Sequence, residues 1–152
     1  MSVSAIPAGY ASITPYLMVR GAVQAIEFYK NVFGAKERLR MPLPEGRVAH
    51  AEIEIGNSVI MLADECPESI SKSPLTVGGT PVSIHLYVPD CDTVFARALA
   101  AGATQIRPLA NQFYGDRSGL FSDPFGHIWN VATHVEDVSE AELHRRMAAL
   151  PK

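Results

Sequence analysis

The sequence lacks several features that would place it in a specialised class of protein. It has only two cysteines, Cys66 and Cys91, without the spacing of a metal site, so we expect reduced thiols in a cytoplasmic protein, with a single disulfide left open. No hydrophobic run approaches the roughly 20 residues that span a bilayer. The segment Met1 to Tyr10 has no basic stretch leading into an apolar core, unlike a secretory signal. We therefore expect no membrane partner.

Charge of one sign is also scarce. The chain carries 13 Lys and Arg against 16 Asp and Glu, a net charge of −3, and its basic residues are scattered. Without a basic stripe, we expect no nucleic-acid partner. The composition is 47% hydrophobic over 152 residues, which is enough to bury a sizeable core. The sequence therefore predicts a single domain over residues 1–152.

What is present is a regular alternation of strand and helix patterns. Small residues with Pro and Gly predict an arm over residues 1–10. The first half then predicts a strand over about 11–19, a helix over 22–33 ending at Gly34, and strands near 36–41, 47–55 and 58–63. Residues 66–80, with two Pro, two Gly and five Ser or Thr, predict a linking loop.

The second half repeats this order. It predicts a strand over 82–88, a helix from Asp90 or Asp92 to about 101, a strand near 104–108, a polar loop over 111–118, and strands over 119–122 and 127–134. Ser139 and Glu142 have the spacing of a capping box, so a final helix is predicted over about 140–150.

Three landmarks support a duplication. Val88 lies 69 residues after Val19, Gly102 lies 68 after Gly34, and Gly126 lies 70 after Gly56. The sequence thus predicts an α+β fold of two βαβββ modules, about 11–65 and 80–136, joined by a loop over 66–79 and followed by a C-terminal helix over about 139–150.

This arrangement predicts a cavity. Each module is a curved mixed sheet with its helix on one face, so the second face is covered only if the two open faces meet around a cavity. The alternating residues that would line it are Thr14, Tyr16 and Met18 from one module and Ser83, His85 and Tyr87 from the other. Such cavities are common binding places for small ligands.

Several motifs resemble a known family. They are Pro15-Tyr16-Leu17, the run from Ile26 to Ala35 containing Phe-Tyr-x-x-x-Phe-Gly-Ala, His50-Ala51-Glu52, and the run from Asp123 to Trp129. Over residues 10 to 136 these motifs are similar to those of the vicinal oxygen chelate superfamily, which includes glyoxalases, bleomycin-resistance proteins and ring-cleaving dioxygenases. One fold of this kind hosts many activities, so the resemblance favours the fold more than any one reaction.

The resemblance also implies where a metal would bind. Enzymes of the family hold a divalent ion with His or Gln in each module's first strand and Glu in its last strand. Carried over by position, these sites fall at about Thr14, Ser83, Ile60 or Met61, and Asn130, none of which is a strong ligand for a transition metal. We therefore expect no metal at the standard site. The alternative is a displaced site for Zn, Ni, Mn or Fe built from His85 with His50, Glu52 or Glu65.

Other candidates have two interpretations each. His50 and Glu52 are either ligands or an acid–base set, or they belong to a solvated face or an ion-pair patch. Tyr114 and Arg117 lie in the predicted polar loop beside the cavity mouth, where Arg117 binds a carboxylate or phosphate or pairs with Asp116. Trp129 is predicted in the core beside the helix, with Asn130 facing the cavity.

The first functional hypothesis is a metal-independent protein that binds a small aromatic or amphipathic molecule, as in the bleomycin-resistance branch. Its ligand-binding residues would be Tyr16, Met18, His85, Tyr87, Tyr114, Arg117 and Asn130. The second is a metal-dependent lyase, isomerase or dioxygenase of glyoxalase type with the displaced ligand set. The third is a dimeric scaffold without a ligand. The resemblance implies a homodimer in each case.

Overall fold

The computed structural model describes residues 2–68 and 70–152. Met1, at the start of the predicted arm, and Ser69, inside the predicted linker, lie outside the described residues. Contacts divide the chain into two units. Unit 1 runs to Pro81 and also includes Pro124–His127, and unit 2 contains Val82–Asp123 and Ile128–Lys152.

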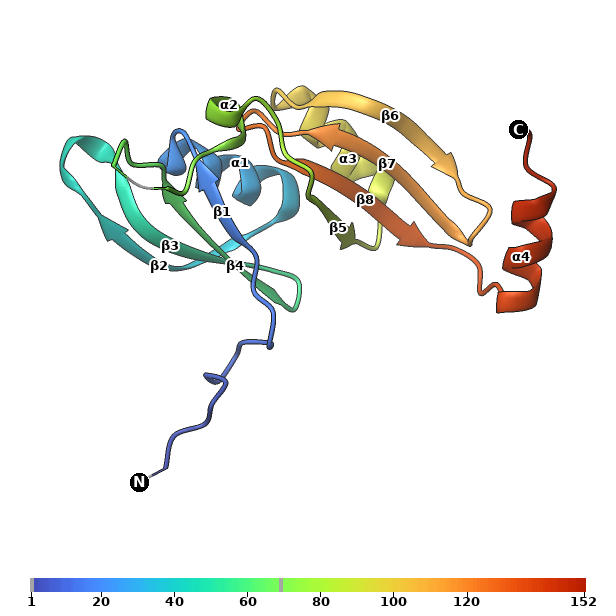
Figure 1. Cartoon of the computed structure of the whole chain (residues 1–152), viewed down its shortest axis with the longest axis horizontal. Helices are drawn as coiled ribbons and strands as arrows, with labels where there is room; N and C mark the ends of the chain where they lie inside the picture. Colours follow the sequence, from blue (N-terminus) through green and yellow to red (C-terminus); the bar gives the residue numbers. More distant parts are fainter. Residues whose placement is uncertain (1, 69) are drawn as a thin grey trace. The chain divides into compact units, whose positions relative to one another are not determined.

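Unit 1 is a four-stranded sheet with one main helix (Figure 1). Its elements are β1 (Tyr16–Val19), α1 (Ala22–Phe33), β2 (Lys36–Pro42), a 3-10 turn (Pro44–Gly46), β3 (Val48–Ile55), β4 (Ser58–Asp64) and the short α2 (Pro74–Val77). The strand order is β1-β4-β3-β2, with β1 parallel to β4 and the other pairs antiparallel.

Helix α1 forms over the residues that its apolar spacing predicts. Ala22, Ala25, Ile26 and Tyr29 are fully buried, as expected for the face that covers the sheet. Phe28 and Val32 are buried as well, because the turn that contains Phe125 covers a second side of the helix. Gly34 ends the helix with φ of 67°, a left-handed conformation that favours glycine.

Two expectations for unit 1 are wrong in extent. The first strand covers only Tyr16–Val19 rather than residues 11–19, because Pro15 has no N–H to donate and contributes only its carbonyl, which accepts from the Met61 N–H. The predicted linker contains α2, which begins after Ser73 with Pro74 in its first turn. A helix of four residues is too short to show a hydrophobic period.

Unit 2 repeats the same architecture with different residues. Its elements are β5 (Ser83–Tyr87), α3 (Cys91–Ala100), β6 (Thr104–Asn111), β7 (Asp116–Ser122), β8 (Ile128–His134) and α4 (Glu140–Ala148). The strand order is β5-β8-β7-β6, and β5 is parallel to β8. The predicted caps form, since the Asp90 carboxylate accepts from the Thr93 N–H and the Ser139 hydroxyl accepts from the Glu142 N–H.

The predicted polar loop of unit 2 is shorter than expected. Strand β6 continues past Pro108 to Asn111, because shifts of register between Gln105 and Ala110 let the edge strand accommodate a proline. Asp116 and Arg117 lie in strand β7 rather than in a loop. Their side chains therefore point to opposite faces of the sheet, which excludes the local cluster that the sequence implied.

Strand pairing confirms the internal repeat. Tyr16 lies opposite Met61, and His85 lies opposite Asn130, with both residues of the second pair 69 positions further along the chain. The same offset relates the first residues of α1 and α3. It also relates Asp64, which accepts hydrogen bonds from the first N–H groups of α1, to Thr133, whose hydroxyl accepts from the Cys91 N–H of α3.

The turn Pro124–His127 belongs to unit 1, far from it in sequence. The Phe125 ring packs 6.2 Å from the Phe28 ring and 6.4 Å from the Tyr29 ring. His127 Nε2 lies 2.8 Å from the Met18 carbonyl, to which it donates. The motifs around Phe28 and Phe125, which are far apart in the sequence, therefore pack against each other.

No helix among the described residues is both long and apolar enough to cross a membrane.

Candidate functional site

The open face of the unit 1 sheet carries a hydrogen-bonded chain of four polar side chains. Its members are Tyr10 from the N-terminal arm, Glu52 and His50 from β3, and Tyr16 from β1. His50 joins Tyr16 and Glu52, with its Nδ1 2.8 Å from the Tyr16 hydroxyl and its Nε2 2.8 Å from Glu52 Oε2. The Tyr10 hydroxyl donates to the other oxygen of Glu52.

The ionised carboxylate fixes the direction of these hydrogen bonds. Hydrogen bonds from Tyr10 and then from His50 hold the pKa of Glu52 below its ordinary value although Glu52 is only 6% exposed. A carboxylate only accepts, so His50 Nε2 carries the hydrogen and, in the neutral imidazole, Nδ1 accepts from the Tyr16 hydroxyl. Burial, followed by the negative charge of Glu52, raises the pKa of Tyr16. Tyr16 is therefore held as a phenol whose oxygen is free to accept a further hydrogen bond.

Tyr16 also lines a pocket within unit 1 of about 360 Å³. Beside it on β1 is Met18, which pairs with Ala63 of β4. The hollow exists because Ala49 and Ala63 bring almost no side chain to a surface with a phenol and a thioether. The full lining consists of Tyr16, Met18, Ala49, Ala63, Asp64, Cys66 and Ser71.

The open face of the unit 2 sheet carries a second polar and aromatic cluster. The rings of His85 and Tyr87 are 4.7 Å apart, and Asn130 Nδ2 donates to His85 Nδ1 at 2.8 Å. The Tyr87 hydroxyl donates to Asp116 at 2.7 Å. The structure therefore brings together His85, Tyr87 and Asn130, three of the predicted ligand-binding residues, around the buried carboxylate of Asp116.

Asp116 is the electrostatic centre of this cluster. Burial favours its neutral form, but hydrogen bonds from His134 and Tyr87 outweigh burial and lower the pKa of Asp116. His134 donates to Asp116 from Nδ1 at 2.8 Å and to Asp137 from Nε2 at 2.7 Å, and these two hydrogen bonds raise the pKa of His134. The hydrogen bond to Asp116 likewise raises the pKa of Tyr87.

The two remaining predicted residues of unit 2 differ in placement. Tyr114 packs edge-on against Phe113 with the ring centroids 5.2 Å apart, and it is 37% exposed. Arg117 forms a two-pronged ion pair with Asp92 of α3, at 2.7 and 2.9 Å. The fork geometry predicted for Arg117 is present, but it holds α3 against β7, and Arg117 does not pair with Asp116.

The register identifies the residues at the family's metal positions. Met61 stands opposite Tyr16 as Asn130 stands opposite His85, so Met61 rather than Ile60 corresponds to Asn130. A thioether and an amide stand where carboxylates would be needed, and Thr14 precedes the first strand. The residues present do not fit the standard divalent site.

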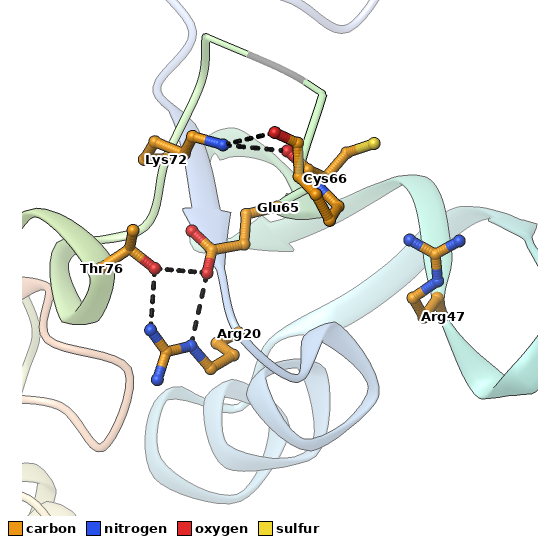
Figure 2. Close-up of a pocket in the computed structure, with 7 residues that line it drawn as sticks. Arg20, Arg47, Glu65, Cys66, Lys72 and Thr76 are labelled. Carbon is orange, nitrogen blue, oxygen red and sulfur yellow. Dashed lines mark hydrogen bonds and ion pairs between the residues drawn. The ribbon is translucent and has the colours of Figure 1, made fainter.

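The displaced ligand set is committed to other contacts. Both ring nitrogens of His50 have partners, and Glu65 accepts from the Ser73 N–H. Glu65 also accepts from the Thr76 hydroxyl and from Arg20, as Figure 2 shows. Binding a metal through these side chains would first require breaking those hydrogen bonds. Within residues 2–68 and 70–152, no three His, Cys, Asp or Glu side chains are grouped to hold a metal ion.

Sequence reasoning missed the partners that come from distant segments. Tyr10 was assigned only to the N-terminal arm, because its spacing from Glu52 carries no periodic signal. His134, which the sequence did not single out as a site residue, is half-exposed and bonded to two carboxylates. The signal that could have found it is the strand alternation, which places His134 on the same face as Asn130.

These features define a class of protein: two βαβββ units, each with one helix-covered sheet face and one open face of polar and aromatic side chains. The model of the Glyoxalase/Bleomycin resistance protein/Dioxygenase superfamily matches residues 10–131. The chain belongs to this superfamily, as its vicinal oxygen chelate motifs predicted.

The chain is also similar to individual proteins. An uncharacterised protein of Mycobacterium tuberculosis is 42% identical over 141 residues, which cover 91% of this chain and 83% of that protein. Protein PA1353 from Pseudomonas aeruginosa is similar in structure, with a TM-score of 0.69 and 25% identity over 83% of this chain and 99% of that one. TioX from Micromonospora sp. ML1 has a TM-score of 0.62 and 26% identity, covering 82% and 99%.

Proposed function

We propose that this protein binds a small aromatic or amphipathic molecule without the standard metal. The observation that carries the proposal is the pocket of about 360 Å³ in unit 1, because its walls are Tyr16 and Met18, two residues selected from sequence alone. An aromatic ring and a flexible thioether offer a large contact area to an apolar ligand. The volume lies at the lower end of the range for small-molecule sites.

The polar chain behind Tyr16 supports a preference in ligand chemistry. With His50 as the neutral imidazole, the Tyr16 hydroxyl donates to its Nδ1, so the Tyr16 oxygen offers lone pairs to the pocket. A ligand with a hydroxyl or N–H group can donate to this oxygen while its apolar part lies against Met18. In unit 2, His85, Tyr87, Tyr114 and Asn130 are proposed to contact a ligand on the open face of their own sheet, whereas Arg117 is proposed to act through its ion pair with Asp92.

A fragment screen with a matched set of variants tests the proposal. Phenolic and indolic fragments are screened by ligand-observed NMR, and hits are titrated against the wild type and against Tyr16→Phe, Met18→Ala and Ala49→Phe. Ala49 is exposed at the pocket, so a phenyl ring there fills the hollow without entering the core. We expect Ala49→Phe to abolish binding and Met18→Ala to weaken it.

Tyr16→Phe isolates the polar contact. We expect a loss of about fivefold to tenfold for a hydroxyl-bearing ligand, roughly the value of one hydrogen bond, and little change for its deoxy analogue. Met147→Ala, which removes an exposed methionine of α4, serves as the control and should not alter binding. Hits that bind equally to all four variants would refute this site.

The alternative, a metal-dependent lyase, isomerase or dioxygenase, has its own test. The untagged protein is dialysed against Zn, Ni, Mn or Fe and its metal content is measured by elemental analysis. We expect no stoichiometric metal. About one ion per chain in the wild type that is lost in His85→Ala would favour the metal enzyme over the binding protein.

A further inference from the structure

A second pocket in unit 1, of about 430 Å³, is lined by three cationic side chains. We propose that it binds the carboxylate or phosphate group of an anionic small molecule through Arg47 and Lys72, while Arg20 is held in the pocket wall by Glu65 and Thr76. In the view of Figure 2, Lys72 and Thr76 stand at the left, Arg47 stands at the right, and Glu65 and Cys66 lie between them, with Arg20 below Glu65. The pocket differs from the one beside Tyr16, although Cys66 belongs to both.

The charge of this pocket is opposite to that of the whole chain. Its lining carries three cations and one carboxylate in a protein whose net charge is −3. Within residues 2–68 and 70–152, the Arg47 guanidinium makes no hydrogen bond or ion pair. Lys72 donates to the carbonyls of Cys66 and Pro67, at 3.3 and 3.0 Å, and forms no ion pair with a carboxylate of the described residues. Two positive charges are thus available to an anion.

The one carboxylate in the lining does not compete for these cations. Hydrogen bonds from the Ser73 N–H and then from the Thr76 hydroxyl lower the pKa of Glu65 to about 2. Arg20 adds a contact from Nε at 3.3 Å, while its Nη2 donates to Thr76 at 2.8 Å. Glu65 therefore acts as the anchor that orients Arg20 and Thr76, and its own charge is already compensated.

The positive charges of the pocket also affect the pKa of the nearby Glu68 carboxyl. Glu68 accepts from the Cys66 thiol, and this hydrogen bond is the largest cause of a lowered pKa of Glu68, to which the charges of Arg47 and Lys72 also contribute. The loop thus presents one exposed carboxylate to the cations. An anionic ligand would compete with Glu68 for them, which makes Glu68 a site where binding is expected to be improved by mutation.

NMR titration at constant ionic strength tests the proposal. Inorganic phosphate and acetate are each added to ¹⁵N-labelled protein, with sodium chloride as the reference, and the amides of Cys66, Ser73 and Thr76 are followed. We expect saturable shifts with at least one of the two anions and none with chloride. Tighter binding of phosphate would indicate a phosphate-bearing ligand, and tighter binding of acetate a carboxylate-bearing one.

Charge variants make the test specific. Arg47→Gln removes no side-chain hydrogen bond or ion pair to a described residue, so it should leave the fold intact while weakening anion binding about fivefold to tenfold. Lys72→Met should weaken binding to a similar degree, and Glu68→Gln should strengthen it. The control is Arg97→Gln in α3 of unit 2, which removes one positive charge far from the pocket in sequence and should not change anion binding. Shifts that do not saturate, or an Arg97→Gln loss equal to that of Arg47→Gln, would overturn the proposal.

Discussion

At the scale of single residues, two buried carboxylates each hold a tyrosine and a histidine side chain in place by accepting their hydrogen bonds. Glu52 and Asp116 are 6% and 4% exposed, and each is satisfied by one tyrosine and one histidine. A buried carboxylate without such donors would cost several kcal/mol, so these partners are required rather than incidental. On the open face of each module, a buried carboxylate is thus hydrogen-bonded by one tyrosine and one histidine, although these residues do not occupy equivalent positions in the two modules.

The ion pairs of His134 with Asp116 and Asp137 predict a specific pH dependence of stability. Its hydrogen bonds raise the folded pKa of His134 above the ordinary 6.5, so the stabilisation is complete below pH 6.5 and disappears as the pH rises through the raised pKa. We expect the urea midpoint of the wild type to exceed that of His134→Gln most at about pH 5.5 and to approach it in alkaline solution. His85, whose Nε2 lies 4.0 Å from Asp116, is unchanged in both proteins. A difference in midpoint that stays constant with pH would contradict this assignment.

At the scale of elements, Asp64 connects three segments of unit 1. Its Oδ1 accepts from the N–H groups of Gly21 and Ala22 at 2.8 and 2.9 Å, and its Oδ2 accepts from the Val48 N–H at 2.8 Å. Helix α1 has no side-chain cap of its own, since Gly21 occupies the N-cap position. A residue at the end of β4 therefore supplies the cap that the local sequence lacks.

Removing this carboxylate should be among the costlier single changes in unit 1. We expect Asp64→Ala to lower the free energy of unfolding by roughly 3 kcal/mol, because three backbone N–H groups lose their acceptor. Thr133→Val, at the equivalent position of unit 2, removes one accepted and one donated hydrogen bond and should cost less, on the order of 1–2 kcal/mol. Urea denaturation of both variants checks the order, and a larger loss in Thr133→Val would refute it.

At the scale of the whole molecule, the homodimer implied by the family resemblance is proposed to use an exposed sheet edge. Strand β2 is the outer strand of its sheet, and Leu39 and Met41 on it are 43% and 51% exposed. An edge strand with unpaired backbone groups and large apolar side chains favours pairing with another chain.

We therefore expect light scattering to give a mass twice the 16.5 kDa of one chain. Met41→Lys should shift the protein towards the monomer, because it places a charge on that edge. Lys152→Met, which alters charge at the C-terminus, is the control. A monomeric wild type at micromolar concentration would exclude the dimer, and a dimer unaffected by Met41→Lys would place the interface elsewhere.

The sequence by itself determined the repeat, helices α1 and α3, the faces of β1, β5 and β8 and the superfamily, because burial imposes periods of 3.6 and 2 on neighbouring residues. Tyr16, Met18, His85, Tyr87 and Asn130 could be selected in this way. Only the tertiary structure decided their partners. Tyr10 and Glu52 are 42 residues apart, as are Asp64 and Ala22, and Arg20 and Thr76 are 56 apart. Such contacts leave no period in the chain, because they depend on where packing brings distant segments together.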